Sequence, residues 1–304
     1  MTARRLEEAR PRPGPAATAA PGRRSRQVRR LAGSLGTYLA VGMVMVFVLF
    51  PFYWTFITSL KSNIDIFNLS GNPLWVRSPT LDNYLYLFRT TLFHRWFLNS
   101  AVVSLITTAF SVTLSVLAGY AIARLRFRGA AFFGVMIFVT YLIPKTLLFI
   151  PLAQVLNQLN VLGSPISLLL TYPTFLIPFC TWLLTGYFRT IPVDLEECAL
   201  IDGCTRLQAL WRITLPLAVP GILTAGIFSF TLSWTDLLYV LAFVNGDVNK
   251  TLTLGATSNL IMQDYYFWGP LMAAAILASI PVAILYFFFV DLYVGGMTAG
   301  AVKG

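Results

Sequence analysis

Six apolar segments, each long enough to cross a lipid bilayer, dominate this sequence. A helix needs about 20 mainly apolar residues to span the hydrocarbon core. The segments cover residues 33–57, 99–122, 131–154, 164–187, 216–243 and 269–292. Only 11% of the residues are charged, against about a quarter in soluble domains, so lipid must be the solvent for most of the surface. The sequence therefore predicts an all-α integral membrane protein with six transmembrane helices.

Prolines interrupt most of these segments and indicate where the helices bend. In a membrane, neighbouring helices can satisfy the carbonyl groups that a proline leaves free. Pro144 and Pro151, together with Lys145, blur the outer end of the third segment, which is the least regular of the six. The sequence therefore predicts kinked spans around a pathway or a packed interior.

The basic residues indicate the orientation of the spans. Residues 1–30 contain nine arginines and two glutamates, and three more arginines lie in the short loop Arg124–Arg128. Because Lys and Arg concentrate on the cytoplasmic side of membrane proteins, both termini are expected in the cytoplasm. Residues 1–30 are also rich in Pro, Ala and Gly, which predicts a disordered basic tail that contacts anionic membrane lipid. The positive charge lies mainly in this tail, so no nucleic-acid partner is expected.

The expected cytoplasmic loop between spans four and five, residues 191–215, carries helix signals of its own. Asp194 followed three residues later by Glu197 has the pattern of a capping box, which predicts that a helix begins there. Gly203 can adopt the left-handed conformation that ends such a helix. A second amphipathic piece around Leu210 leads into the fifth span. The loop is either a projecting helix that contacts a partner or an amphipathic linker lying on the membrane.

The spacing within this loop resembles the EAA signature of permease subunits in ATP-binding-cassette importers. It reads Glu197-Cys198-Ala199, then Gly203, Ile213 and Leu215-Pro216, with Cys198 in place of the signature's middle alanine. The resemblance implies a coupling helix that sits in a cleft of an ATPase subunit, with Glu197, Ala199 and Gly203 docking and turning it. The implied coupling residues are Glu196, Glu197, Cys198, Ala199, Asp202, Gly203, Ile213, Leu215 and Pro216.

Other stretches narrow the resemblance to the carbohydrate branch of this family. They are Pro51–Lys61 at the exit of the first span, Asn83-Tyr84, Asn99-Ser100 and Ser233–Asp236. The ending Met297–Gly304 is similar to the tail of the second permease subunit of maltose-type importers, which reaches between the two ATPase subunits. That likeness implies ATPase contacts at Thr298, Gly300 and Lys303.

The resemblance also implies an organisation and a set of partners. Residues 1–30 would be the basic cytoplasmic tail, residues 31–296 the permease domain with its coupling loop, and residues 297–304 a C-terminal cytoplasmic tail. The implied complex lies in a bacterial inner membrane and contains a second permease, two nucleotide-binding ATPase subunits and an extracytoplasmic solute-binding protein. The expected function is ATP-driven import of a mono-, di- or oligosaccharide by alternating access.

ATP chemistry is expected to belong to the partners. Gly246–Thr251 has the wrong spacing for a phosphate-binding Walker loop, so the chain is expected to be no enzyme and to bind no cofactor itself. ATP and Mg²⁺ would bind the partner ATPase subunits. The three cysteines and one histidine cannot assemble a zinc cluster, so no metal site is expected.

Polar groups at membrane depth are the candidates for a substrate pathway, because such groups are costly to bury in lipid. Asp236 lies beside Trp234 and Thr235, a set that could stack on a sugar ring and bond its hydroxyls. Lys145 is a further candidate, which could instead snorkel outward. The alternative for Asp236 is a structural hydrogen bond that fixes a break in the fifth span.

The two longest outer loops, residues 61–98 and 244–267, are rich in aromatic residues. Aromatic rings gather at membrane–water interfaces, so one interpretation is an interfacial belt. The other is a landing surface for an extracytoplasmic partner.

Other functions remain open from the sequence. A glycerol-phosphate-type importer permease shares these motifs. An ion-coupled secondary carrier would place paired acidic groups or unwound helices at the midplane, but Asp236 has no obvious acidic companion and the loop would be unexplained. A membrane-embedded enzyme would need a carboxylate or histidine cluster that the sequence does not offer.

Overall fold

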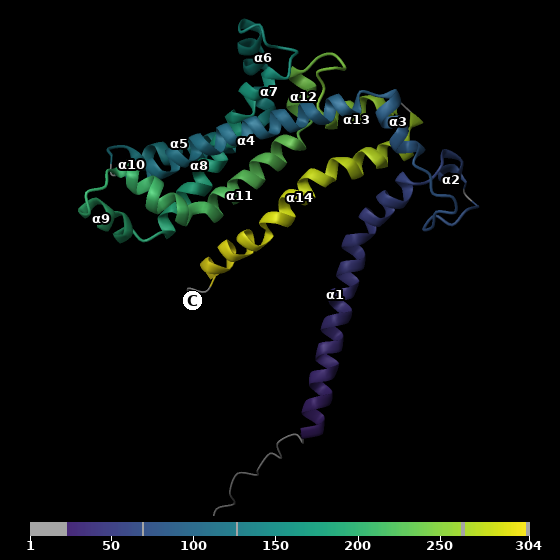
Figure 1. Ribbon diagram of the computed structural model, residues 1–304, viewed down its shortest axis with the longest axis horizontal. Helices are drawn as coiled ribbons and strands as arrows, with labels where there is room; N and C mark the ends of the chain where they lie inside the picture. The colour runs from purple at the N-terminus through teal and green to yellow at the C-terminus, as the bar shows by residue number, and fades with distance from the viewer. Residues whose placement is uncertain (1–22, 69, 126, 263–264, 302–304) are drawn as a thin grey trace, which may run out of the picture. The chain divides into compact units, whose positions relative to one another are not determined.

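The computed structural model describes residues 23–68, 70–125, 127–262 and 265–301. The residues up to Tyr53 and those from Trp54 onward form two separate units. The described part of the chain is almost entirely helical (Figure 1). Its α-helices are α1 (Arg23–Ser59), α2 (Asn63–Phe67), α3 (Asp82–Thr90), α4 (Phe93–Arg124), α5 (Ala130–Leu142), α6 (Phe149–Gln158), α7 (Ile166–Thr171), α8 (Pro173–Thr190), α9 (Asp194–Ile201), α10 (Arg206–Ala209), α11 (Leu215–Trp234), α12 (Leu238–Phe243), α13 (Leu252–Leu260) and α14 (Trp268–Ala301).

Four short elements complete this inventory. A 3-10 turn, η1 (Lys145–Leu148), precedes α6, and a π-helical turn, η2 (Leu210–Thr214), joins α10 to α11. Strands β1 (Ile261–Met262) and β2 (Tyr265–Tyr266) form a small antiparallel hairpin, in which Ile261 pairs with Tyr266.

Five helical stretches are long and apolar enough to cross a membrane, and a bent pair would make a sixth span. The stretches are Gly36–Ser59, Phe93–Arg124, Ile166–Thr190, Arg206–Trp234 and Trp268–Val290. They confirm five of the predicted spans. The fifth is shorter than predicted at its outer end, because α11 stops at Trp234 and α12 is a separate helix.

The third predicted span, residues 131–154, is wrong as a continuous helix. The chain bends by 93° between Ala130–Leu142 and Lys145–Gln158. Pro144 explains the bend, because proline disfavours the helical conformation of the residue before it. Ile143 is accordingly extended, with φ −69° and ψ 121°.

Within the second unit, α4 lies at the centre of the helical bundle. It packs against α8 and α11, while α14 packs against α11 and α5 packs against α8. Small residues allow some of these contacts: a Cβ added at Gly221 of α11 would lie 2.5 Å from Cγ of Tyr187. Close approach at small residues drives helix association in membranes, where burial of apolar surface contributes little.

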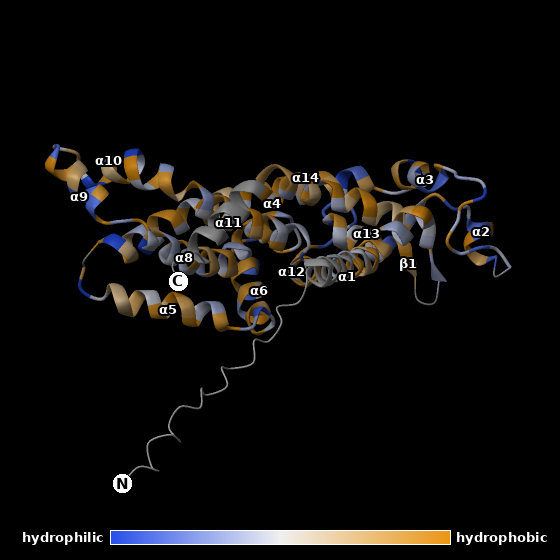
Figure 2. Ribbon diagram, turned by 90° about the horizontal axis from the view of Figure 1, so that it is seen from below, coloured by the Kyte–Doolittle hydropathy of each residue, from blue (hydrophilic) through white to orange (hydrophobic). Residues whose placement is uncertain are grey.

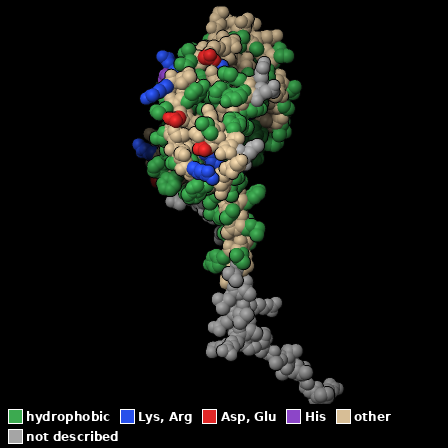
Figure 3. All heavy atoms as spheres, turned by 90° about the vertical axis from the view of Figure 1, so that its right-hand side faces the viewer, with side chains coloured by type: hydrophobic (Ala, Val, Ile, Leu, Met, Phe, Trp, Pro, Cys, Tyr) green, Lys and Arg blue, Asp and Glu red, His purple; other side chains and the backbone are tan. Residues whose placement is uncertain are grey.

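The bundle has a hydrophobic outside as well as a hydrophobic core. Large apolar side chains such as Phe133, Trp182 and Phe287 are exposed. Figure 3 looks onto the end with α2 and α3, where Lys, Arg, Asp and Glu side chains lie among hydrophobic ones. Hydrophilic residues gather instead in the segments around α9, α2 and α3 (Figure 2). This distribution is that of a surface solvated by lipid along its length and by water at its ends.

The two loops predicted to lie outside, residues 61–98 and 244–267, are tied together at the start of α4. Trp96 Nε1 donates to the Asp247 carbonyl at 2.7 Å, and Asn99 Nδ2 donates to the carbonyls of Val248 and Lys250 at 2.8 and 2.9 Å. Ser100 Oγ accepts from the Leu252 amide at 2.8 Å. Residues 61–98 and 244–267 therefore meet at one end of the bundle, opposite the end that carries α9 and α10 (Figure 1).

Candidate functional site: a helical loop anchored to the bundle

The predicted loop helix exists as α9 and ends in a Schellman motif. Gly203 has φ +89°, the left-handed conformation that glycine adopts without steric cost. Its amide donates to the Leu200 carbonyl at 3.1 Å, and the Cys204 amide donates to the Ala199 carbonyl at 3.0 Å. These are the two bonds that define the motif. The prediction that Gly203 ends the helix is confirmed.

The predicted capping box at Asp194 and Glu197 is wrong. The residue before the helix is Val193, which already has helical dihedral angles, and no side chain caps α9. Asp194 therefore lies inside the first turn, where its carboxylate is not placed to accept from the third amide. A complete capping box occurs instead at α10, where Thr205 and Gln208 exchange bonds of 2.8 and 3.3 Å.

Glu196 anchors α9 to the interior of the bundle. Its Oε1 lies 3.1 Å from Arg124 Nε, and both side chains are almost fully buried, 3% and 6% exposed. Thr214 donates to Oε1 at 2.7 Å and Tyr120 donates to Oε2 at 3.1 Å. Arg124 also donates from Nη2 to the Ile191 carbonyl at 2.6 Å. One carboxylate thus joins α9 to the end of α4 and to η2.

The other predicted coupling residues divide into an exposed and an inward-facing group. Glu197, Cys198, Asp202, Gly203 and Pro216 are exposed, whereas Ile213 and Leu215 are half-buried. Ala199 and Glu196 are buried. The methyl group of Ala199, for which the resemblance implies a docking role, thus turns toward the chain itself, and that role stays a prediction. Cys198 is the small residue that the helix exposes.

Asp236 and Lys145 form a second, looser polar site at two helix breaks. Lys145 Nζ lies 3.8 Å from Asp236 Oδ1, with Lys145 35% exposed and Asp236 5% exposed. Asp236 Oδ2 accepts from the Tyr239 amide at 3.0 Å and from the Tyr172 hydroxyl at 3.3 Å. The alternative in which Asp236 fixes a break in the fifth span is confirmed, because its carboxylate bonds the first turn of α12. Lys145 does not snorkel away, since it also lies 3.8 Å from the Phe175 ring centre.

Trp234 and Thr235 lie beside Asp236 in the sequence, but their side chains donate to other groups than the Lys145–Asp236 pair. Trp234 is 3% exposed, stacks on Phe230 and donates from Nε1 to the Ala278 carbonyl at 3.0 Å. Its ring is thus enclosed by α4, α11 and α14 and is not open to a sugar ring in this structure. Thr235 is exposed, but its hydroxyl donates to the Thr231 carbonyl at 2.7 Å.

The tail contacts lie beyond the part of the chain whose side chains are described. Thr298 and Gly300 belong to α14, and Lys303 is outside the described residues altogether. Their roles remain predictions.

Several residues of both polar sites were not singled out from the sequence. In the sequence Arg124 is one of three arginines in a short loop, and Tyr120, Thr214 and Tyr172 carry no signal of their own. Arg124 lies in the last turn of a predicted span, but only the packing of the helices shows that it faces the buried Glu196. Tyr172 has no signal in an apolar segment that contains many aromatic residues.

The fold and this anchored loop define a multi-pass membrane permease. The chain matches the family described as the inner membrane component of binding-protein-dependent transport systems over residues 111–298. It belongs to this family and is the permease subunit of such an importer in the inner membrane.

Named relatives agree with this assignment. The chain is 37% identical to the sulfoquinovosyl glycerol transport system permease protein of Agrobacterium fabrum, over 88% of this chain and 93% of that one. It is 35% identical to the trehalose transport system permease protein of Mycobacterium tuberculosis, over 88% and 98%. It is 33% identical to the diacetylchitobiose uptake system permease protein of Streptomyces coelicolor, over 91% and 99%.

A solved structure shares the fold. It is a bacterial ATP-binding-cassette transporter involved in the import of the acidic polysaccharide alginate, with a TM-score of 0.75 and 21% identity. The match covers 90% of this chain and 99% of that chain.

Proposed function

We propose that this chain pairs with a second permease to form the membrane pathway for a sugar, which an extracytoplasmic binding protein delivers. The names of the relatives support this, because they refer to sulfoquinovosyl glycerol, diacetylchitobiose and trehalose, which are sugar glycosides or saccharides. Two partner ATPase subunits, which bind ATP and Mg²⁺, supply the energy. Both termini lie in the cytoplasm, and α5 with α6 counts as the third of six spans. Residues 1–30 and 297–304 are then the cytoplasmic tails.

The anchored helix α9 is the observation that carries the ATP-driven mechanism. It projects from the bundle on the Gly203 turn and exposes Glu197, Cys198 and Asp202 to a partner. These residues enter the cleft of an ATPase subunit. Residues 191–215 are thus the coupling loop, and α9 is its coupling helix.

The buried carboxylate of Glu196 makes this helix a lever. A push on α9 reaches α4 through Arg124 and Tyr120, and reaches α11 through Thr214 and η2. Closure of the ATPase subunits on ATP would therefore move two membrane-spanning helices together. Alternating access of the pathway follows from that movement.

Polar groups at the two helix breaks face the sugar. Lys145 is partly exposed beside Asp236, at the point where α5 and α6 bend and α11 ends. Thr235 is exposed next to this pair. Lys145 and Thr235 are the contacts offered to sugar hydroxyls, and Asp236 holds Lys145 in place.

The decisive experiment is uptake of labelled sugar by vesicles that contain the complete complex. Uptake should require the ATPase subunits and ATP on their side of the membrane. Gly203→Pro should abolish it, because proline cannot adopt φ +89° and removes the amide that bonds Leu200. The variant should still insert into the membrane. Sugar uptake driven by an ion gradient without ATPase subunits would overturn the proposal.

A further inference from the structure

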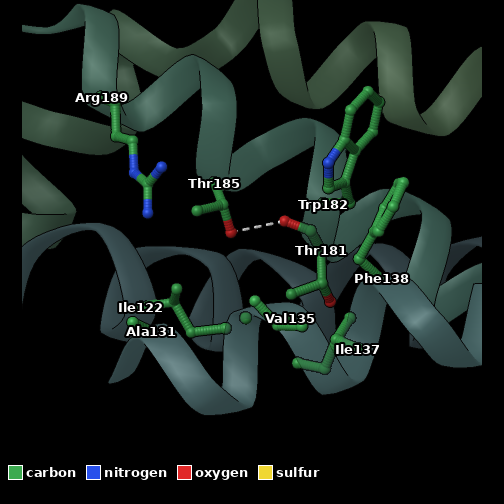
Figure 4. Close-up of a pocket in the computed structure, with 10 residues that line it drawn as sticks. Ile122, Ala131, Val135, Ile137, Phe138, Thr181, Trp182, Thr185 and Arg189 are labelled. Carbon is green, nitrogen blue, oxygen red and sulfur yellow. Dashed lines mark hydrogen bonds between the residues drawn. The ribbon is translucent and has the colours of Figure 1, made fainter. Parts of the chain in front are cut away.

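A cavity of about 320 Å³ lies between α4, α5 and α8, apart from both polar sites described above. Its volume falls at the lower end of the range for ligand pockets. Its walls are mostly apolar (Figure 4). The lining residues that matter are Ile122, Val135, Phe138, Thr181, Trp182 and Arg189.

The cavity has one cationic end and one aromatic end. Figure 4 places Arg189 at one side and the rings of Phe138 and Trp182 at the other. These two rings contact each other, with centroids 5.7 Å apart. Thr181 and Arg189 are eight residues apart on α8, which corresponds to about 12 Å along a helix. The lining therefore matches an elongated molecule with a charged head and an apolar tail.

Two polar groups of this lining have no partner in the described residues. Arg189 is exposed at the end of α8, and no carboxylate of the described chain lies within ion-pairing distance of its guanidinium. Thr181 is only 1% exposed, yet its Oγ1 has no hydrogen-bond partner there. A buried hydroxyl without a partner is costly. The cavity thus offers a cation and a buried hydroxyl to a ligand.

We propose that this cavity binds an anionic phospholipid of the surrounding membrane. The phosphate of the headgroup pairs with Arg189, and an acyl chain runs along Val135 and Phe138 to Trp182. An ester oxygen of the lipid bonds the Thr181 hydroxyl. Basic pockets between membrane-spanning helices have the chemistry that retains such headgroups. A sugar is excluded because the mostly apolar walls cannot satisfy its hydroxyls.

Trp182 provides the measurement. The complete transporter is reconstituted in vesicles with either brominated phosphatidylglycerol or brominated phosphatidylcholine, since bromine quenches tryptophan fluorescence on contact. Subtraction of the same complex carrying Trp182→Phe isolates the signal of this residue. Half-maximal quenching should need an about fivefold lower mole fraction of the anionic lipid, as expected for one basic side chain near an anionic headgroup.

Substitutions at Arg189 test the cationic end of the cavity, and one at Gly134 tests its apolar wall. Arg189→Gln should make both lipids equal, whereas Arg189→Lys should retain the preference. Gly134→Leu should abolish the preference by filling the cavity, because a Cβ at Gly134 meets only Ile122, at 3.4 Å. Arg212→Gln is the matched control, since Arg212 is exposed and does not line the cavity; it should leave the preference unchanged.

Three outcomes would overturn the proposal. One is equal quenching by the two lipids in the unmodified transporter. The second is a preference that survives Arg189→Gln. The third is no quenching of Trp182 by either lipid, which would mean that a protein partner covers this face. Sugar uptake is not the readout, so failure here leaves the proposed transport function standing.

Discussion

Two of the ion pairs in the described part of this permease, Arg124–Glu196 and Lys145–Asp236, differ in distance and burial. Arg124 and Glu196 lie 3.1 Å apart, are both nearly fully buried, and share bonds with Tyr120 and Thr214. Lys145 and Asp236 lie 3.8 Å apart, with the lysine about one-third exposed. A buried charge cannot lose its partner without a large penalty, whereas a partly exposed one can turn to water.

We infer a mechanical role for each pair from this difference. We expect the Arg124–Glu196 pair to stay intact and to join the proposed coupling helix to the bundle. We expect the Lys145–Asp236 pair, which connects two helix breaks, to separate and re-form, because the lysine can turn to water. A transporter that alternates between two states needs contacts that persist and transmit the movement, and others that break when the helices move.

The largest expected effect comes from breaking the joint. Glu196→Ala leaves Arg124 buried without a counter-charge, which should lower the free energy of unfolding by about 3–5 kcal/mol. Thermal unfolding of the purified complex measures the loss, and ATP-driven uptake should disappear with it. The matched control is Glu197→Ala, because Glu197 is exposed on the same helix and its loss should leave the unfolding temperature unchanged. If the two substitutions lowered the unfolding temperature equally, Glu196 would not anchor α9 more strongly than the exposed Glu197.

A smaller effect is expected at the turn that follows the joint. Gly203→Ala places a side chain in the left-handed conformation, at a cost of about 1–2 kcal/mol. No atom lies within 4 Å of the added Cβ, so backbone strain is the only penalty. Gly203→Asn should cost less, since asparagine adopts this conformation more readily. The ratio of uptake to ATPase activity should fall in the order Gly, Asn, Ala if the turn sets the angle of α9; a reversed order would contradict this.

Substitutions of the two partners of the Lys145–Asp236 pair should lower the free energy of unfolding by different amounts. Asp236→Ala removes the cap on the Tyr239 amide and should cost about 0.5–2 kcal/mol. Lys145→Met leaves the buried Asp236 without a counter-charge, but the carboxylate keeps its bonds from Tyr239 and Tyr172, so the cost should be smaller than that of Glu196→Ala. Thermal unfolding compares them, and sugar uptake shows whether Lys145 contacts the cargo. If Lys145→Met destabilises the protein as much as Glu196→Ala, the two pairs do not differ in kind.

The smallest expected effect is at Cys198. The side chain is exposed on α9, so Cys198→Ala should change the stability by less than about 0.5 kcal/mol. A bulky maleimide on the thiol should nevertheless block assembly with the ATPase subunits, which co-purification would measure. Prior assembly should protect the thiol from the reagent. Labelling at the same rate before and after assembly would place the docking face elsewhere.

Much of the fold could be predicted because membrane helices are local in origin. Length and apolarity alone predicted five spans. The end of α9 at Gly203 was predictable because it depends on the backbone conformation of that single glycine. The bend at Ile143 and Pro144 was visible only as irregularity, since a proline in a membrane helix can kink it or break it. The capping box failed at Asp194 for a similar reason, because a pattern of two residues cannot say where the first helical turn begins.

The sequence predicted only part of the proposed coupling site. Spacing identified the residues of α9 but not which of them face inward, so Ala199 and Glu196 were grouped with the exposed Glu197. Trp234 was assigned to the pathway because it is adjacent to Asp236 in sequence. The helix turns its ring toward α14 instead, while the carboxylate bonds the next helix.

The sequence by itself determined a helical membrane protein, the position of its spans and a loop with the spacing of a docking helix. These properties depend on apolar length and on conformations of single residues. Only the tertiary structure decided which charges are joined. The partners of Glu196 lie 72 residues before it and 18 after it, at Arg124 and Thr214, and Asp236 meets Lys145 across 91 positions. Such pairs form because buried charges must find partners, and the helix packing determines which ones are within reach.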